Sequence, residues 1–325
     1  MTELSINPMI DHRKGKLDKI ENFMAILLLL GFILGIILQY STLEFIPTND
    51  DNWRIEILAE QYYQSFHHIL LLLSLILTIL PSFFFIPTSL RMQSQFMGSR
   101  IYRGRDFLRF IGWSQSLLGI FYFVSFFIPS YMLENQIYLL FEPFIAHIFM
   151  LFAFLLTVFH KRQGIGLQTG FSWFKALIFI IVIYLSIGLF IDLLVTEPIA
   201  KLFDLELVSW REEQISQEIL GASQNGWLGS IFEILMIGLL VPIAEEIMFR
   251  GLIQTIIHRK LGKWVGMILT ALLFALIHVD LSLLAPLFVI GMVLSWLKVY
   301  FNSLWPPIMF HILMNSISTF IYLIQ

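Results

Sequence analysis

Residues 227–257 read WLGSIFEILMIGLLVPIAEEIMFRGLIQTII. This stretch is long enough to cross a bilayer, because a hydrocarbon core about 30 Å thick needs about 20 apolar helical residues. Near its middle it carries two acids and a base, Glu245, Glu246 and Arg250. A charged side chain at the centre of a spanning helix costs about 2.5–3.5 kcal/mol, so these three residues need partners or a function. The stretch therefore predicts a membrane helix that carries a polar site.

The whole chain has the composition of a membrane protein. Of its 325 residues, 58% are hydrophobic and 13% are charged, and the net charge is -3. A typical soluble domain has about 25% charged residues. The composition excludes an ordinary soluble fold and argues against a disordered chain and against a basic surface for nucleic acid, so the expected environment is the lipid bilayer. Because the chain has no cysteine, a disulfide scaffold, a cysteine nucleophile and a cysteine metal ligand are also excluded.

Nine apolar runs separated by polar stretches predict an all-α, polytopic membrane helix bundle with about nine transmembrane helices. The runs are 23–38, 69–87, 111–133, 137–159, 173–195, 227–257, 264–279, 281–300 and 304–325. The first run follows 22 mostly polar residues and has no clear cleavage signal after it, so we interpret it as a retained anchor rather than a signal peptide.

The distribution of Lys and Arg predicts the orientation. If the first 22 residues are cytoplasmic, the inner connections hold 14 Lys and Arg, five of them in 88–110, and the outer connections hold three. The acidic residues instead gather in the outer loops 39–66 and 196–226. Since inner loops carry the excess of positive charge, we expect the N-terminus inside and the C-terminus outside.

The longest polar stretch after the first pair of runs suggests the internal boundary. We expect a five-helix membrane region at 1–195, an extracytoplasmic loop at 196–226 and a catalytic membrane region at 227–325. Residues 199–220 mix apolar and acidic side chains, which fits either a helix on the outer membrane surface or an ordinary solvated loop.

The two acids of the central stretch face different surroundings. Glu246 and Arg250 form an i,i+4 pair on one helix face, whereas Glu245 points about 100° away. Glu246 should therefore stay ionised and suits a supporting electrostatic role. Glu245 has no cation at i±3 or i±4, so burial favours its protonation and suits it to act as a general base or acid near neutral pH. Adjacent helices could reverse this division, and Pro242 could kink the helix towards a cavity.

Two histidines in later runs complete a possible site. His278 ends the seventh run, and His311 lies in the ninth run with Asn315 on the same face at i,i+4. With a rise of 1.5 Å per residue, Glu245, His278 and His311 all fall within about 10 Å of the membrane midplane. Two His and two Glu at compatible depths can bind zinc or activate a water molecule, although a structural ion pair remains the alternative for Glu246 and Arg250 alone.

These residues resemble the motifs of the CPBP family of intramembrane proteases. That family includes the type II CAAX prenyl endopeptidases and the bacteriocin-processing and immunity (Abi-like) proteins of bacteria. The resemblance covers about 227–325, and three motifs in the family's order carry it: Glu-Glu-x-x-x-Arg at Glu245, Glu246 and Arg250, Phe-x-x-x-His at Phe274 and His278, and His-x-x-x-Asn at His311 and Asn315.

The resemblance implies hydrolysis of a peptide bond in or beside the membrane by a glutamate-activated water. By position, Glu245 would be the general base, supported by Glu246 and Arg250. His278 and His311 would be metal ligands, with Glu245 as a third, or hydrogen-bond donors to the oxyanion, and Asn315 would be a second donor. Zinc is therefore a hypothesis, and the partner would be a peptide or membrane-protein substrate in what we expect to be a bacterial cytoplasmic membrane.

Two other classes of function fit the same residues. In a transporter, the buried Glu and His side chains would relay protons or bind an ion, although no inverted repeat is evident. A catalytically silent membrane scaffold would keep the fold and bind a partner, but it gives no chemical reason to bury four titratable side chains. The substrate, the oligomeric state and the role of the five upstream helices do not follow from the sequence.

Overall fold

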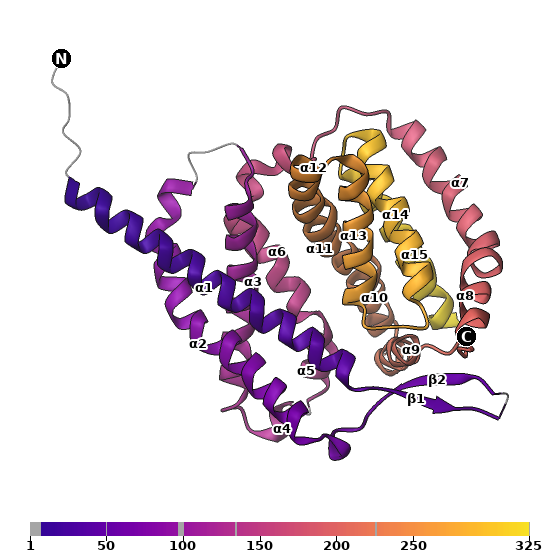
Figure 1. Ribbon diagram of the computed structural model, residues 1–325. Coiled ribbons are helices and arrows are strands. Elements are labelled where there is room, and N and C mark those ends of the chain that lie inside the picture. Colours follow the sequence, from indigo (N-terminus) through magenta and orange to yellow (C-terminus); the bar gives the residue numbers. More distant parts are fainter. Residues whose placement is uncertain (1–7, 50, 97–100, 134, 225, 325) are drawn as a thin grey trace. The chain divides into compact units, whose positions relative to one another are not determined.

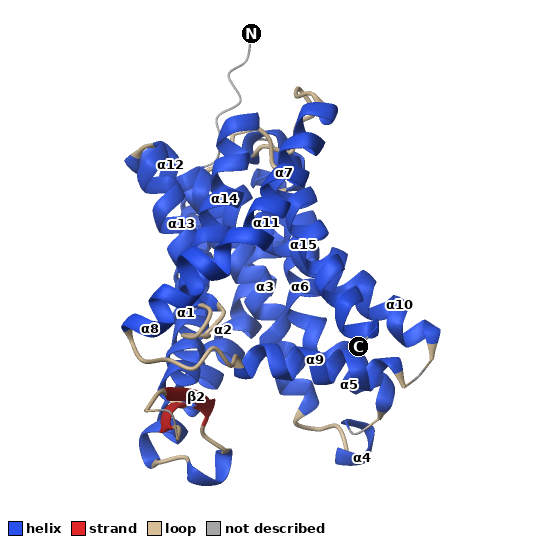
Figure 2. Ribbon diagram, turned by 90° about the vertical axis from the view of Figure 1, so that its right-hand side faces the viewer, coloured by secondary structure: helices blue, strands red, loops and turns tan. Residues whose placement is uncertain are grey.

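The computed structural model describes residues 8–49, 51–96, 101–133, 135–224 and 226–324, and nearly all of them are helical (Figures 1 and 2). The prediction of an all-α polytopic helix bundle is confirmed. Within the described ranges, eight helices are long and apolar enough to cross a membrane, and a ninth apolar helix, Lys263–Ile277, is shorter. At 1.5 Å per residue its 15 residues span about 22 Å, less than the hydrocarbon core.

The chain divides into two compact units, 1–35 with 68–164 and 36–67 with 165–325. The helices of the first unit are α1 (Pro8–Ser41, whose last residues belong to the second unit), α2 (Ser65–Phe96, whose first residues belong to the second unit), α3 (Gly104–Ser125), α4 (Ser130–Leu133), α5 (Gln136–Phe141) and α6 (Ile145–Thr157). The short helix η2 (Glu142–Phe144) leads into α6, and η3 (Phe159–Ile165) follows it.

The second unit holds the remaining elements. These are the strands β1 (Leu43–Pro47) and β2 (Trp53–Ile57), the short helix η1 (Glu60–Tyr62), and the helices α7 (Trp173–Ile191), η4 (Asp192–Thr196), α8 (Glu197–Leu202), α9 (Trp210–Ser223), α10 (Trp227–Leu235), η5 (Met236–Leu240), α11 (Val241–Glu246), η6 (Ile247–Gln254), α12 (Thr255–Leu261), α13 (Lys263–Ile277), α14 (Leu284–Phe301) and α15 (Trp305–Ile324).

Three segments differ from the sequence prediction. The predicted inner loop 88–110 is mostly helical, because α2 runs to Phe96 and α3 begins at Gly104, and of its five basic residues Arg100 lies outside the described residues. The predicted run 111–133 is broken after Ser125, before the short α4. The helix that begins with α7 continues without interruption to Leu202, well beyond the predicted end at 195.

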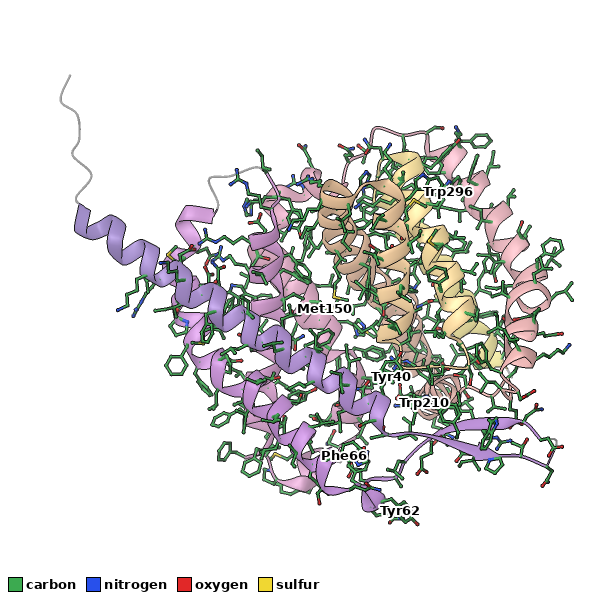
Figure 3. All side chains as sticks on the ribbon, in the orientation of Figure 1. Tyr40, Tyr62, Phe66, Met150, Trp210 and Trp296 are labelled. Atoms are coloured by element: carbon green, nitrogen blue, oxygen red, sulfur yellow. The ribbon has the colours of Figure 1, made fainter. Side chains whose placement is uncertain are left out.

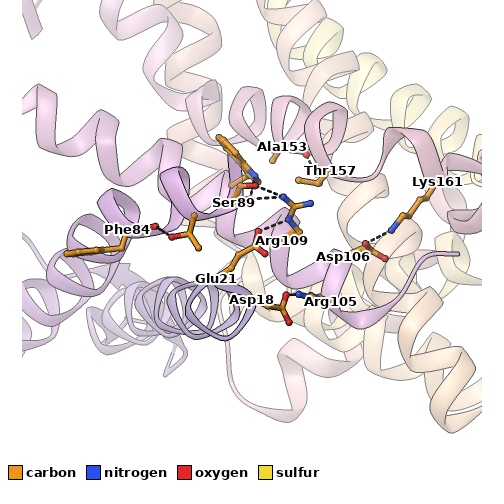
Figure 4. Close-up of polar contacts among 12 residues, drawn as sticks. Asp18, Glu21, Phe84, Ser89, Arg105, Asp106, Arg109, Ala153, Thr157 and Lys161 are labelled. Carbon is orange, nitrogen blue, oxygen red and sulfur yellow. Dashed lines mark hydrogen bonds and ion pairs between the residues drawn. The ribbon is translucent and has the colours of Figure 1, made fainter. Parts of the chain in front are cut away.

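The first unit is held together by buried charges that the sequence analysis had counted as loop charges (Figure 4). Arg109 in α3 bonds Glu21 of α1 at 2.7 Å and the Ser89 hydroxyl of α2 at 2.9 Å. Asp106, one turn earlier, accepts a hydrogen bond from Lys161 at 2.6 Å. All of these charged side chains are buried. In each pair the opposite charge compensates for the hydration lost on burial. These contacts join α1, α2, α3 and η3 at fixed positions.

A two-stranded hairpin follows α1 in a segment expected to be an outer loop. β1 and β2 pair antiparallel, with Leu43 opposite Ile57 and Pro47 opposite Trp53. Trp53 also pairs with Leu205 in an isolated parallel bridge. Arg54 binds both carboxylate oxygens of Glu206, at 2.7 and 3.0 Å, and this hydrogen bonding lowers the pKa of Glu206. The hairpin therefore fixes the segment that joins α8 to α9.

The predicted surface segment 199–220 is helical at both ends. It contains the end of α8 and most of α9, which is capped at its N-terminus by the Ser209 hydroxyl. Within the second unit, α9 and the hairpin lie at the end where α15 finishes, and α12 lies at the opposite end (Figure 1). The extracytoplasmic location of α9 stays a prediction from the charge distribution.

The buried ion pair of the first unit yields a stability prediction. Arg109→Ala should lower the free energy of unfolding by about 3–5 kcal/mol, because it leaves the Glu21 carboxylate buried without its cation. Denaturation of the purified protein in detergent, followed by tryptophan fluorescence, measures this change.

The exposed pair Lys201–Glu197 on α8 provides the control. Lys201→Ala should change the stability by less than about 1 kcal/mol, since solvent screens this pair. Combining Arg109→Ala with Glu21→Gln should recover part of the loss, and equal losses for Arg109→Ala and Lys201→Ala would contradict the structural role.

Candidate active site

The helix predicted from 227–257 is continuous but not regular. It runs from α10 to α12, and two π-helical segments, η5 and η6, flank the single α-helical stretch α11 that ends with Glu245 and Glu246. Pro242 lies at the start of α11, where its missing N–H cannot bond the preceding turn. A π-segment widens the helix, turns the following side chains and is common at functional sites. The irregular backbone thus sets the directions of both carboxylates.

The two carboxylates meet opposite nitrogens of one imidazole. The Nδ1 atom of His311 lies 3.0 Å from Oε1 of Glu246, and its Nε2 atom lies 3.8 Å from Oε2 of Glu245. The first distance is a hydrogen bond, whereas the second is too long for one. Because a carboxylate only accepts, Nδ1 carries the proton and donates it to Glu246, so a neutral His311 presents the lone pair of Nε2 towards Glu245.

Glu246 is completely buried and is held by a cation as predicted. Arg250 donates from Nη1 to the same Oε1 atom at 2.8 Å and from Nη2 to the Gly291 carbonyl at 3.2 Å. The Arg250 guanidinium also lies 4.2 Å from the centre of the Phe274 ring. Arg250 is itself fully buried, and a carboxylate, a carbonyl and an aromatic face together compensate for part of its lost hydration.

Further polar contacts join η6 to α14. Gln254 donates to the Ser295 carbonyl at 3.1 Å, one turn along from the Arg250 contact with Gly291. In the opposite direction, Lys298 donates to the Arg250 carbonyl and, at 2.6 Å, to the Thr255 hydroxyl. A widened helix leaves carbonyl groups without their usual partners, and a side chain from the next helix can bond them. These contacts fix η6, and therefore Arg250, against α14.

Small residues bring these helices close enough for the contacts to form. A Cβ atom at Gly291 would lie 3.0 Å from Cα and 3.1 Å from Cβ of Ala271 on α13. A Cβ atom at Gly238 in η5 would lie 2.5 Å from the Ser316 hydroxyl on α15. A methyl group at either position would make neighbouring atoms shift, so glycine allows the helices to approach this closely.

The predicted ligand His278 is the residue directly after α13. Its Nδ1 atom lies 2.6 Å from the Phe274 carbonyl, so Nδ1 carries the proton and Nε2 presents its lone pair. The rings of His278 and His311 both pack against Phe274, with centroids 4.7 and 5.8 Å from it. The Glu245 carboxylate is close enough to interact electrostatically with His278 and with Arg250. Phe274 is thus the common packing surface of the site.

Asn315 lies one turn beyond His311 on α15. Its amide donates to the Ile237 carbonyl of η5 at 3.3 Å, and the neighbouring Ser316 donates to the Gly238 carbonyl at the same distance. In this structure the amide therefore connects α15 to η5. One of its two N–H groups is used in this bond, and the second is available to another acceptor.

The donor chemistry of the site matches a zinc ion only in part. Both imidazoles use Nδ1–H on an oxygen acceptor and keep Nε2 as the possible ligand atom, which is typical of metal-bound histidine. However, across the described part of the chain no group of three or more His, Asp or Glu side chains is arranged to hold a metal ion. His278, His311 and Glu245 are therefore not gathered as a zinc site, and zinc stays a prediction.

Comparison with known proteins gives the family of this region. The family model described as "Type II CAAX prenyl endopeptidase Rce1-like" matches residues 227–317. Residues 227–317 therefore form a region of the Rce1-like, CPBP type. The resemblance inferred from the three motifs is thus confirmed, and all three lie inside the matched segment.

Two curated bacterial proteins resemble parts of the chain. The "Putative membrane peptidase YdiL" of Bacillus subtilis is 29% identical over 115 residues, which are 35% of this chain and 44% of that protein. The "Uncharacterized 24.3 kDa protein" of Escherichia coli is 31% identical over 86 residues, 25% of this chain and 40% of that protein. The chain thus spans less than half the length of either relative. No solved structure matches the chain significantly.

Several residues that build the site were absent from the sequence analysis of the chemistry. Lys298 lies inside the predicted run 281–300, where a lysine already indicates a polar partner. Gln254 and Gly291 gave no comparable signal, because an amide or a glycine in a membrane helix has many common roles. Their importance follows from the close packing of η6 against α14. This packing cannot be inferred from a single sequence.

The close approach at Gly291 can be tested by adding one methyl group. Gly291→Ala should lower the free energy of unfolding by about 1–3 kcal/mol, because the methyl group overlaps backbone and side-chain atoms of Ala271. Thermal unfolding in detergent measures the loss. Gly188→Ala on α7 is the control, since no atom lies within 4 Å of the added carbon there. Equal thermal stability of the two variants would show that α13 and α14 do not pack as closely as described.

Proposed function

We propose that this integral membrane protein is an intramembrane endopeptidase in which Glu245 is the general base. The observation that carries the proposal is the pair of contacts around His311, with Glu246 hydrogen-bonded to Nδ1 and Glu245 3.8 Å from Nε2. The Rce1-like match over 227–317 and the similarity to YdiL support peptide-bond hydrolysis as the reaction.

A water molecule suits the space between Glu245 and His311. The carboxylate oxygen and the neutral Nε2 atom both accept hydrogen bonds, and at 3.8 Å a single water can donate one hydrogen to each. Its oxygen lone pairs then remain available for attack on a carbonyl carbon. As the bond to carbon forms, Glu245 takes the proton from the water and later delivers it to the leaving amine nitrogen.

Glu246 and Arg250 support this step without taking the proton. Glu246 accepts from His311 Nδ1, which fixes the ring and its tautomer, and Arg250 donates a second hydrogen bond to the same carboxylate. In this proposal the sequence-based division between the two acids is retained. Each carboxylate faces a different nitrogen of the same ring and therefore has a separate role in this proposal.

Developing negative charge on the substrate carbonyl oxygen needs hydrogen-bond donors. In our proposal Asn315 offers its second amide N–H. His278 offers Nε2–H once this nitrogen is protonated, because its Nδ1 proton already bonds the Phe274 carbonyl. The two residues would thus approach the oxyanion from α15 and from the end of α13.

We propose a peptide or a membrane-associated protein as the substrate and a bacterial cytoplasmic membrane as the location. The location rests on the two bacterial relatives. The word CAAX in the family description concerns other proteins, and no residue discussed here selects a prenylated substrate.

Replacing the proposed base gives the first functional prediction. Glu245→Gln should reduce cleavage at least about 100-fold, because the amide keeps the shape of the side chain but cannot accept the proton from water. Comparative peptidomics of membranes that carry the wild type or the variant tests catalysis and reveals the cleaved bonds. Glu197→Gln on the exposed face of α8 is the matched control and should cleave normally.

Two results would contradict the assignment. Undiminished cleavage by Glu245→Gln would exclude this residue as the base. Substrate-dependent proton flux in proteoliposomes, without hydrolysis of any peptide, would instead favour a transporter.

Metal removal separates the water mechanism from the zinc hypothesis. Two ligands of a tetrahedral zinc ion with bonds of about 2.0–2.1 Å lie about 3.3–3.4 Å apart. The Glu245 and His311 atoms are 3.8 Å apart, which is longer than this separation. Cleavage by the purified protein should therefore stay within about twofold after dialysis against a strong chelator. Loss of cleavage that zinc restores would establish the metal alternative.

A further inference from the structure

The last turn of α13, which carries His278, is bonded by side chains from two distant segments. Helices leave their final carbonyl groups without partners inside the helix. Here the Tyr40 hydroxyl donates to the Leu276 carbonyl at 2.8 Å, and Arg211 donates to the His278 carbonyl at 3.2 Å. Tyr40 lies in the last turn of α1 and Arg211 in the first turn of α9, both in the second unit. The end of α13 is therefore held from outside the helix.

The residue after His278 has an unusual backbone. Val279 is completely buried and has a positive φ angle of 52°. A β-branched residue in the left-handed region is strained, and such a conformation persists only where the surroundings enforce it. The chain turns sharply here, directly beside the proposed active-site histidine.

Asp280 makes the contacts that enforce this turn. One carboxylate oxygen accepts from the Leu283 backbone N–H at 3.0 Å, and the other accepts from the Ser209 hydroxyl. Ser209 in turn accepts from the Glu212 N–H at 3.0 Å, as the N-terminal cap of α9. Asp280 and Ser209 are only 1% and 4% exposed. The same hydroxyl thus begins α9 and bonds the turn that follows His278.

We propose that Ser209, Arg211 and Asp280, termed here the α9 clasp, position His278 for the reaction. The inference rests on the proposed function and adds positioning residues to it, none of which contacts the reacting atoms. The His278 ring is tied to its own helix through the Phe274 carbonyl, so it moves with the last turn of α13. That turn is fixed by the clasp and by Tyr40, which is labelled in Figure 3 together with Trp210 of α9.

The clasp stays closed during turnover. Its two central side chains are buried and satisfied by hydrogen bonds, and opening it would release the strained turn at Val279 and move His278. A lid that must open for each substrate would behave in the opposite way. If the clasp positions His278, a covalent link between Ser209 and Asp280 should maintain kcat. If the clasp is a lid, the same link should lower kcat.

A reversible disulfide tests this difference. The chain contains no cysteine, so the double variant Ser209→Cys, Asp280→Cys can form only the intended bond within one molecule. In the reduced form the clasp is broken, and kcat should fall about 10–100-fold with KM within about twofold. Oxidation should join the two positions and return kcat to within about threefold of the wild type, and a reductant should lower it again.

The single variants and a conservative variant complete the experiment. Ser209→Cys and Asp280→Cys alone should not respond to oxidation. Asp280→Asn, which keeps one acceptor oxygen and can donate to Ser209, should retain much more kcat than Asp280→Ala at similar thermal stability. A merely structural contact would instead lower stability and leave the kcat of the folded enzyme unchanged.

Three results would overturn the proposal. Equal thermal stability of Asp280→Ala and the wild type would refute the contact itself, whatever the protein catalyses, because the loss of this carboxylate should leave Ser209 and the Leu283 N–H without their partner. Full activity in the reduced double variant would refute positioning, and loss of activity on oxidation would show a lid. In the same assay, equal cleavage by the wild type and Glu245→Gln would mean that the proposed function has failed. This failure is distinguishable from failure of the clasp proposal, because disulfide formation and thermal stability are measured without substrate.

Discussion

One buried carboxylate organises the site. Oxygen Oε1 of Glu246 accepts a hydrogen bond from Arg250 and another from His311, and so joins the central helix to α15 at a fully buried point. Removing either partner would leave a charge unsatisfied, so the contacts depend on one another. The tautomer of His311, and therefore the atom that faces Glu245, follows from this arrangement.

The backbone around Glu246 is irregular for the same reason. The π-segments η5 and η6 turn the carboxylates towards α15, and the carbonyl groups they leave are bonded by Asn315, Ser316 and Lys298 from neighbouring helices. In lipid no water can take their place, so irregular backbone is tolerated only where protein groups bond it. Stability and the direction of the reactive groups are therefore produced by the same set of contacts.

The sequence predicted the fold class and the Glu246–Arg250 pair, because each charge in an apolar run demands a nearby partner. It placed Glu245, His278 and His311 at similar depths, whereas the acid that forms a hydrogen bond with His311 is Glu246. It did not predict the hairpin at 43–57 or the burial of Arg109, since a basic residue near a helix end is indistinguishable from a loop charge until its acid, Glu21, is placed beside it. It also placed Asn315 beside the imidazole or the substrate, whereas the amide bonds Ile237. The Ile237 carbonyl belongs to the π-segment η5. The spacing of apolar residues did not predict this segment, and Pro242 was the one sign of an irregular helix there.

The two imidazoles are held in different ways, and this difference has a consequence for the chemistry. His311 lies within a regular helix and is fixed by a buried carboxylate, so its position is set by the core of the second unit. His278 follows the last residue of a helix too short to cross the hydrocarbon core, and its position is set by Tyr40 and by residues at the start of α9. A change in α9 would therefore alter one side of the site while the Glu246–His311 contact stays in place. In a peptidase this separation would let α9 alter the hydrogen bonds to the oxyanion without disturbing the activation of water.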